Sequence, residues 1–192
     1  MEKNLIIKKQ EEEIKELKKE KVKLKKLVYL DYLTKLYNRR GLIEVGKVYF
    51  KAVKNKDKNR RKNEIKFLSI IFLDIDDFKK INDKYGHSRG DKVLKSFANF
   101  LRKNFRETDV ISRWGGEEFV VLLFNTPHQL AIEKTINTRK KIENFVFSGL
   151  KLTSSLGVLS YHKEKSLEEL VDKADKLMYQ AKRKGKNQVV VG

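Results

Sequence analysis

Two short stretches of the chain carry carboxylates next to residues that predict a β-strand. The first stretch follows residues 67–73. That run is apolar and long enough for a buried central strand, and Asp74-Ile75-Asp76-Asp77 comes directly after it. A carboxylate at the end of a buried strand is costly unless it is solvated, paired or bound to a metal ion. Asp74 is therefore a candidate for a functional site, whereas Asp76 and Asp77 have the structural alternative of capping the following helix.

The second stretch is RWGGEEF at residues 113–119, with Ile111 before it and VVLLF at 120–124 after it. The β-branched and aromatic flanks predict two strands, and the Gly-Gly pair predicts a tight hairpin turn, because glycine accepts φ > 0 without steric cost. Side chains alternate along a strand, so Glu117 and Glu118 are expected to point in different directions. A turn with a bare backbone and a flanking carboxylate suits a phosphate–metal ligand. A solvated turn is the alternative.

These stretches belong to a set of motifs that resembles the GGDEF family, the diguanylate cyclases, in the family's order and spacing. GGEEF at 115–119 is a form of the family's signature. The other motifs are DYLTKLYNRR at 31–40, DIDDFKKIN at 74–82, YGHSRGD at 85–91 and AKRKGKN at 181–187. The last departs from the family pattern A-K-x-x-G-R-N, because Lys186 keeps the charge of the arginine but lacks its bidentate geometry. The resemblance covers roughly residues 31–192.

The resemblance implies both a fold and a reaction. The fold is α/β (α+β), with a central, mostly antiparallel five-stranded sheet wrapped by helices, related to polymerase palms and class III nucleotide cyclases. The reaction joins two GTP molecules into cyclic di-GMP and releases two pyrophosphates, each 3′-hydroxyl attacking the α-phosphate of the other nucleotide. Such chemistry depends on in-line placement and charge neutralisation. Each subunit would hold one GTP, so the resemblance implies a homodimer and an inert monomer.

Roles for individual residues also follow from the resemblance. Mg²⁺, with Mn²⁺ as the alternative, would be held by Asp74, Glu117 and the carbonyl of Ile75, a hard-oxygen set that suits this ion. Glu117 is also implied as the proton acceptor, and Lys79 as a residue that stabilises charge on the phosphates.

The implied nucleotide-binding residues are Phe78, Asn82, Asp91, Gly115, Gly116, Lys182 and Lys186. Asn82 and Asp91 would recognise guanine, because a carboxylate accepts from the N1–H and N2–H₂ groups that adenine lacks. The two glycines would leave room for the nucleotide. Lys182 and Lys186 would reach the β- and γ-phosphates.

An R-x-x-D sequence, Arg106 to Asp109, begins nine residues before Gly115. This is the placement of the product-inhibition site in the family, where cyclic di-GMP would bind as an inhibitor. The planar fork of arginine can meet a phosphate or a guanine edge bidentately. Arg139 is the nearest candidate for a further arginine of this site. The alternative for Arg106 and Asp109 is an ordinary surface ion pair.

Residues 1–30 are expected to form one helix, because proline is absent and Glu, Lys and Leu dominate. Apolar residues follow a seven-residue repeat: Ile7, Ile14, Leu17, Leu24 and Val28. Three positions of the same repeat are polar: Gln10, Lys21 and Asp31. A parallel coiled-coil stem and a solvated amphipathic helix are the two alternatives. We expect a stem over 1–30 and one domain over 31–192.

Further along the chain, several helix starts are predicted from capping residues. Asn38 is expected to cap a helix that carries Leu42, Val45, Val48 and Tyr49. Ser88 with Asp91, and Ser166 with Glu169, form capping-box patterns. Pro127 is expected in the first turn of another helix.

The remaining predictions concern strands and a connection. Residues 153–161 and 189–191 are expected to be strands. Residues 51–66, which are crowded with Lys and Arg, are expected to be a solvated connection. The helix after residue 91 should turn these side chains inward: Val93, Leu94, Phe97, Phe100 and Leu101.

Composition limits the classes of function. The 192 residues include 45 Lys and Arg against 26 Asp and Glu, a formal net charge of +19 that favours anionic partners, with compositional bias as the alternative. The absence of cysteine excludes disulfides and thiolate metal sites. No apolar run reaches the roughly 18 residues of a membrane span, and the N-terminus leads into charge, so we expect a cytoplasmic chain without a membrane segment.

Two rival functions remain to be weighed. An RNA-binding module on a similar sheet would carry RNP-type motifs, which the sequence lacks, so no nucleic-acid partner is expected. A degenerate domain could bind GTP or cyclic di-GMP without turnover. Against it stand the site residues present in this sequence: Asp74, Lys79, Glu117 and Glu118.

Overall fold

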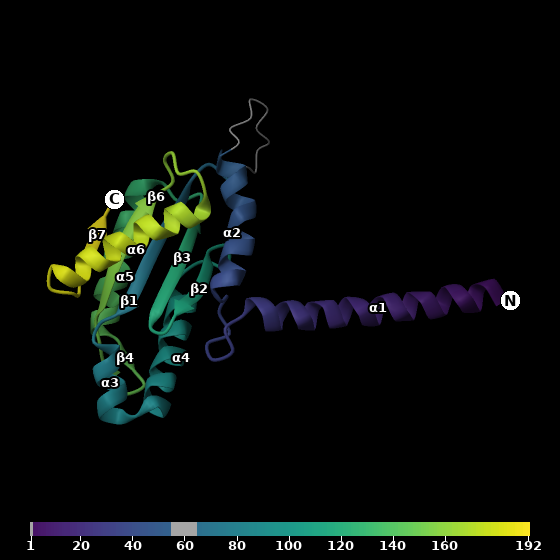
Figure 1. Ribbon diagram of the computed structural model, residues 1–192, viewed down its shortest axis with the longest axis horizontal. Helices are drawn as coiled ribbons and strands as arrows, with labels where there is room; N and C mark the ends of the chain where they lie inside the picture. The colour runs from purple at the N-terminus through teal and green to yellow at the C-terminus, as the bar shows by residue number, and fades with distance from the viewer. Residues whose placement is uncertain (1, 55–64) are drawn as a thin grey trace.

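A computed structural model describes residues 2–54 and 65–192, and its centre is one five-stranded sheet (Figure 1). The strands lie in the order β2-β3-β1-β6-β7. They span Leu68–Ile75 (β1), Val110–Gly115 (β2), Glu118–Phe124 (β3), Ser154–Ser160 (β6) and Val189–Val191 (β7). Neighbours are antiparallel except β6 and β7, which are parallel. This confirms the expected mostly antiparallel sheet and the strands expected over 153–161 and 189–191.

Six helices and a small hairpin complete the described part of the chain. The helices are α1 (Glu2–Tyr29), α2 (Arg39–Lys54), α3 (Phe78–Tyr85), α4 (His87–Asn104), α5 (His128–Asn144) and α6 (Leu167–Arg183). The hairpin pairs β4 (Val146–Phe147) with β5 (Leu150–Lys151). Within the described ranges, no helix is both long enough and apolar enough to cross a lipid bilayer.

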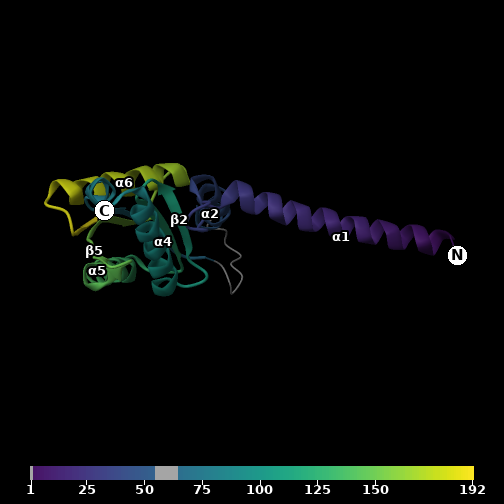
Figure 2. The same ribbon diagram turned by 90° about the horizontal axis from the view of Figure 1, so that it is seen from below.

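Strand β1 is buried along its whole length because helices cover both faces of the sheet. Ile71 and Leu73 pack into one hydrophobic cluster with residues of α4 and α5, while Ile70 and Phe72 pack into another with residues of α2 and α6. Figure 2 shows these layers, with α2 and α6 along one face and α4 and α5 along the other. Side chains alternate between the faces of a strand, so a strand covered on both faces must be apolar throughout.

The helix starts agree only in part with the capping predictions. Asn38 caps α2, since its Oδ1 accepts from the N–H of Gly41 at 2.8 Å, and Ser166 caps α6 by accepting from the N–H of Glu169 at 3.1 Å. The Ser88–Asp91 box was wrong, because α4 already begins at His87 and no side chain caps it. Pro127 lies one residue before α5 instead of in its first turn.

The inward face of α4 is as expected, with Val93, Leu94, Phe97, Phe100 and Leu101 all buried. On α2, Val48 is 68% exposed and therefore lies off the predicted apolar face. The expected connection over 51–66 was wrong at its start, since α2 continues to Lys54. Residues 55–64 of that prediction lie outside the described residues.

Helix α1 extends away from the domain (Figure 1), which confirms a single helix in this part of the chain. The residues of the seven-residue repeat that were named above are 41% to 57% exposed: Ile7, Ile14, Leu17, Leu24 and Val28. The helix therefore offers an apolar stripe to solvent. Whether a second helix covers the stripe is part of the proposal below.

Candidate active site

Asp74 is the second-last residue of β1, and its carboxylate is only half satisfied. The residue is 3% exposed, and its Oδ2 lies 2.6 Å from Nζ of Lys182 on α6. Its Oδ1 is buried and has no hydrogen-bond partner within the described chain. Burial raises the pKa of Asp74 to about 6, against the lowering effect of Lys182, and nearby Glu117 and Glu118 raise it further. A buried carboxylate oxygen without a partner is the unusual feature of this end of the sheet.

The β2–β3 hairpin brings the second carboxylate stretch to the same place. Asp74 pairs across the sheet with Glu118, and Ile75 donates its N–H to the carbonyl of Glu117 at 3.4 Å. The two carboxylate stretches found in the sequence therefore meet at one end of the sheet, although Asp74 and Glu117 are 43 positions apart in the sequence.

The turn itself differs from the prediction in position and in cause. Its two central residues are Gly116 and Glu117, because Gly115 still pairs with Glu118. Neither glycine has positive φ, so left-handed backbone does not explain them. A Cβ on Gly115 would lie 3.0 Å from a carboxylate oxygen of Glu118, whereas a Cβ on Gly116 would meet nothing within 4 Å. Gly115 thus accommodates Glu118, and the space beside Gly116 is open.

Glu118 belongs to the same charged group. Burial raises its pKa, the charge of Asp175 raises it further, and the charge of Lys182 lowers it. Lys182 thus compensates both Asp74 and Glu118.

Asp76 supports the site in a way that the sequence reasoning missed. It is buried and does not cap a helix; its oxygens accept from the hydroxyls of Thr153 at 2.7 Å and Ser155 at 2.6 Å, and from the N–H of Asn187 at 3.0 Å. Asp76 thereby ties the strand end to the loop after α6. Asn187 stood in the AKRKGKN motif, which was the only sequence signal for this contact.

Lys186 lies in that loop, where the backbone turns sharply. Lys186 and Asn187 have φ of 64° and 48°, conformations that are uncommon outside glycine. The Lys186 Nζ lies 2.9 Å from Oδ2 of Asp77, whose other oxygen pairs with Lys80. Asp77 stands at the start of α3 but its side chain makes no capping bond. The structure thus places Lys182 and Lys186, the two lysines of the motif predicted to reach phosphates, against aspartates of the β1 end.

The residues assigned to guanine lie between α3 and α4. Phe78 is buried at the start of α3, Lys79 is exposed beside it, and Asn82 and Asp91 are partly exposed. A Cβ on Gly90 would clash with the side chains of Asn82 and Phe78. Gly90 was not among our candidates, yet its lack of a side chain lets Asn82 of α3 pack directly against α4, next to Asp91.

Arg106 and Asp109 lie away from this edge, in the turn that joins α4 to β2. Asp109 is buried and accepts from the backbone N–H of Arg106 at 3.0 Å, so the alternative of a surface ion pair was wrong. Burial raises the pKa of Asp109. Arg106 borders a hollow of about 350 Å³, together with Lys134 and Lys141 of α5.

Arg139 does not line that hollow. Its guanidinium pairs with Glu143 at 2.7 Å and with Oδ1 of Asn187 at 3.1 Å. The geometry does not bring Arg139 to Arg106, and its place in the inhibitory site stays a prediction. The basic residues of α5 that line the hollow are Lys134 and Lys141.

The β1 end fits a divalent cation by its donor chemistry. It holds an unpaired buried carboxylate oxygen on Asp74 and a second carboxylate on Glu117, and hard cations prefer such oxygens. No group of three or more His, Cys, Asp or Glu side chains within the described residues could hold a metal by itself. A cation here would need ligands beyond the protein's side chains, such as a backbone carbonyl, water or phosphate.

Comparisons with known proteins agree with this geometry. A family model described as "Diguanylate cyclase, GGDEF domain" matches residues 28–188. Diguanylate cyclase A of Treponema denticola is 41% identical over 129 residues, which cover 65% of this chain and 35% of that protein. Diguanylate cyclase DgcM of Escherichia coli is 35% identical over 182 residues, covering 93% and 42%. The chain spans between a third and a half of the length of these two relatives.

Solved structures show the same fold. The coiled coil and GGDEF domain of DgcB from Caulobacter crescentus, in complex with c-di-GMP, superposes with a TM-score of 0.83 over all of both chains, at 20% identity. The active GGEEF domain of a diguanylate cyclase from Vibrio cholerae has a TM-score of 0.68 and 28% identity, covering 80% of this chain and 96% of that one.

Proposed function

The chain belongs to the GGDEF domain family, and we propose that it is a diguanylate cyclase, which joins two GTP into cyclic di-GMP and releases two pyrophosphates. The observation that carries the proposal is the buried, half-satisfied carboxylate of Asp74 beside the Gly116–Glu117 turn. A carboxylate of this kind is costly in a structural role and useful in a cation site.

The proposed cation is Mg²⁺, with Mn²⁺ as the alternative, held by Asp74, Glu117 and the carbonyl of Ile75. When bound, it would neutralise charge on the triphosphate and orient it for in-line attack. Glu117 accepts the proton of the 3′-hydroxyl. Lys79 and Lys186 offer positive charge to the phosphates, and Lys182 already stands within the group of carboxylates.

We propose that polar residues of α3 and α4 select guanine. Asn82 and Asp91 would hydrogen-bond the base edge, and the open space beside Gly116 would admit the nucleotide. A carboxylate acceptor at this point favours the N–H donors of guanine over adenine. Phe78 is buried at the start of α3, beneath these residues.

The reaction requires two subunits, so we propose a homodimer of half-sites that pairs through the apolar stripe of α1. On this account residues 1–30 are a coiled-coil stem and residues 31–192 the cyclase domain, in the cytoplasm where GTP is available. Pairing of the stems raises the effective concentration of one half-site around the other.

A substitution in the stripe tests the stem. Ile14→Lys with Leu17→Lys should lower specific activity at low protein concentration and leave it nearly unchanged at high concentration. Glu16→Lys, on the same helix outside the stripe, is the control. Equal loss in both variants, or none in either, would contradict the role of the stripe.

The proposed activity is tested by incubating the purified chain with GTP and Mg²⁺ and separating the products by chromatography. We expect cyclic di-GMP and pyrophosphate in a one-to-two ratio, with no product when the cation is chelated. GTP binding without any cyclic product, at high protein concentration and with either Mg²⁺ or Mn²⁺, would instead identify a binding module without turnover.

A further inference from the structure

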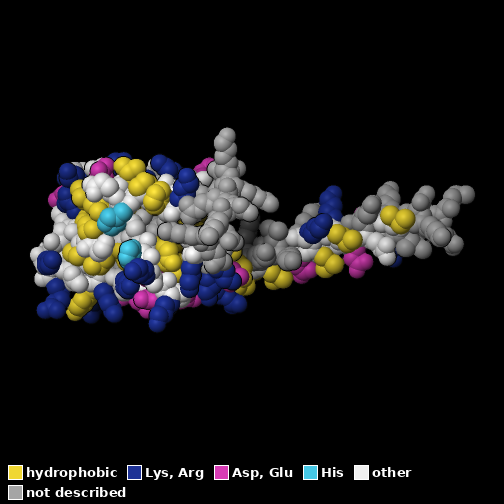
Figure 3. Space-filling view, turned by 90° about the horizontal axis from the view of Figure 1, so that it is seen from above, with side chains coloured by type: hydrophobic (Ala, Val, Ile, Leu, Met, Phe, Trp, Pro, Cys, Tyr) yellow, Lys and Arg dark blue, Asp and Glu magenta, His cyan; other side chains and the backbone are white. Residues whose placement is uncertain are grey.

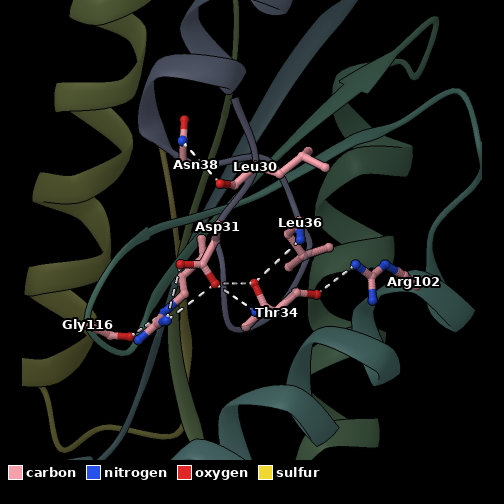
Figure 4. A network of polar contacts seen from close by, with 8 residues as sticks. Leu30, Asp31, Thr34, Leu36, Asn38, Arg102 and Gly116 are labelled. Atoms are coloured by element: carbon pink, nitrogen blue, oxygen red, sulfur yellow. Dashed lines mark hydrogen bonds and ion pairs between the residues drawn. The ribbon is translucent and has the colours of Figure 1, made fainter. Parts of the chain in front are cut away.

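Arg113 connects the hairpin turn to Asp31, the residue that follows the stem. Figure 4 shows Asp31 and Gly116, the two residues that it joins. Its Nε donates to the carbonyl of Gly116 at 2.8 Å, and its Nη1 lies 3.3 Å from each carboxylate oxygen of Asp31. Both side chains are only 14% exposed. One guanidinium thus contacts the turn that carries Glu117 and the second residue of the segment between α1 and α2.

Asp31 is itself held in a fixed orientation. Its Oδ1 accepts from the N–H of Thr34 at 2.8 Å and from the hydroxyl of Thr34 at 2.7 Å. The carbonyl of Thr34 accepts from Arg102 on α4 at 2.8 Å. Burial opposes ionisation of Asp31, but the bonds from Thr34 and the charge of Arg113 outweigh it and lower its pKa. Asp31 is therefore an ionised partner that cannot easily follow a moving arginine.

Backbone contacts join the same two segments. Arg113 donates its N–H to the carbonyl of Tyr37 at 2.8 Å, and Tyr37 donates to Ile111 at 3.2 Å. Asn38 reaches back with its amide to the carbonyl of Val28 in the last turn of α1, at 2.9 Å. The segment after the stem therefore lies along the outer edge of β2 and is bonded at both of its ends.

The hairpin turn is weakly held by its own ladder. The β2–β3 register shifts between Arg113 and Gly115, and the bond from Ile75 to the Glu117 carbonyl is 3.4 Å long. Bonds of that length are near the limit for an N–H donor. The bond from the Arg113 side chain to the Gly116 carbonyl, at 2.8 Å, is therefore shorter than the bond that ties the turn to β1.

We infer that Arg113 is a positioning residue for Glu117, held by Asp31, so that the end of the stem determines where the hairpin turn lies. The effect on turnover rests on the proposed cyclase activity, whereas the positioning of the turn rests on the contacts of Arg113 alone. Arg113 would not need to touch the nucleotide, since its bonds are directed at Gly116 and Asp31. Displacement of the turn moves Glu117, and small misplacements at a reacting centre are expensive.

Kinetics give the first test, in the full chain. Asp31→Asn removes the charge of the partner, and Arg113→Lys removes the ability to contact both acceptors at once. Each should lower kcat about ten- to a hundredfold, the scale of a misplaced group. KM for GTP should stay within about twofold, because the residues assigned to guanine, Asn82 and Asp91, are unchanged. The double variant should be no slower than the slower single variant.

The ion pair between Lys47 of α2 and Glu168 of α6 supplies the control cycle. It also joins two elements, at 2.8 Å, but has no described bond to the hairpin. Lys47→Met and Glu168→Gln should leave kcat unchanged, singly and together. If the Asp31 and Arg113 effects multiply as independent losses, or if KM for GTP changes as much as kcat, the positioning role is wrong.

Amide hydrogen exchange gives the second test, which does not need activity. In Asp31→Asn the amide of Ile75, which bonds the turn, should exchange about tenfold faster relative to the amide of Leu73 two residues earlier in β1. Equal acceleration at both amides would indicate a general loss of stability and would overturn the inference, as would no change. If the unsubstituted chain makes no cyclic di-GMP, the proposed function fails, while the exchange result still decides the coupling.

Discussion

The two ends of the central sheet both bury polar side chains, but they satisfy them differently. Where β1 begins, Ser69 bonds Ser160 at 2.7 Å and the carbonyl of Thr126 at 3.3 Å, and His128 lies 2.9 Å from Ser160. These groups form a short closed network. Figure 3 shows this end of the molecule, with histidine among hydrophobic side chains and with Lys and Arg around them. His128 and Ser160 also line a hollow of about 820 Å³.

Where β1 ends, Asp74 keeps one buried oxygen without a partner and has a pKa raised to about 6 by its burial. Asp76, two residues later, accepts hydrogen bonds on both of its carboxylate oxygens, from the hydroxyls of Thr153 and Ser155. Hydrogen-bond donors are therefore present at this end of β1. Buried polar groups in native proteins are normally paired, and exceptions mark places where a ligand is expected. At the two ends of β1, the Ser69–Ser160 group is satisfied by its own bonds, whereas the Asp74 carboxylate is not, and we therefore expect a ligand at Asp74. Asp109, just before β2, also has a buried oxygen without a partner, so by the same argument we expect a second ligand beside Arg106.

The largest effect should come from the second end. Glu117→Gln removes the charge of a proposed cation ligand and proton acceptor while preserving shape, so turnover should fall by at least about 10³-fold. The melting temperature should hardly change. Glu168→Gln, an exposed glutamate on α6, is the control and should keep full activity. Undiminished cyclic di-GMP from the Glu117 variant would refute its assignment.

Selectivity should be the next largest effect. Asp91→Ala removes an acceptor for guanine N–H donors, and the preference for GTP over ATP should fall by roughly 10²-fold, mainly through kcat/KM for GTP. Rates with both nucleotides would be compared under the same cation concentration. Comparable use of ATP and GTP by the unsubstituted chain would contradict the assignment of Asn82 and Asp91 to guanine.

Product inhibition should respond to a change at a third place. Arg106→Ala should raise the concentration of added cyclic di-GMP needed for half inhibition about tenfold or more, because charged bonds to a phosphate are lost. The initial rate should be unchanged. Arg139→Ala is the control, since Arg139 faces Asn187 and not the hollow beside Arg106. Inhibition that persists in the Arg106 variant would leave the R-x-x-D turn without a ligand role.

The smallest effect on activity should come from the first end. Ser69→Ala opens the network with Ser160 and should cost about 1 kcal/mol of unfolding free energy, or roughly 2–4 °C in Tm for a chain of this size. The rate of cyclic di-GMP formation below the melting transition should remain. A large loss of activity with unchanged Tm would show that the two ends are not separated in function.

Much of the fold could be predicted from local pattern. The apolar run before Asp74 predicted a strand covered on both faces, and Asn38 and Ser166 predicted helix starts that the capping bonds confirm. Such signals depend on residues close in sequence. The Ser88–Asp91 pattern failed because Gly86, with φ of 80°, ends α3 and begins α4 two residues earlier than the box requires.

The site could be predicted only where a motif pointed to it. Asp74 and Glu117 were found from strand ends and a glycine turn, but the bonds of Asp76 to Thr153 and Asn187 join segments distant in sequence. The contact between Arg113 and Asp31 spans 82 residues and left no periodic signal. Nearness in sequence also suggested Arg139 as a partner for Arg106, but the side of α5 that a residue occupies depends on packing, and Arg139 bonds Asn187.

The central claim is that the unpaired oxygen of Asp74 belongs to a cation site. Its most direct test is a titration with Mn²⁺, followed by electron paramagnetic resonance, in the presence of 3′-deoxy-GTP, which lacks the attacking hydroxyl. The account predicts one bound cation per chain, and an affinity at least about tenfold weaker in Asp74→Asn with no loss of thermal stability. Equal affinity in the two proteins would contradict the claim.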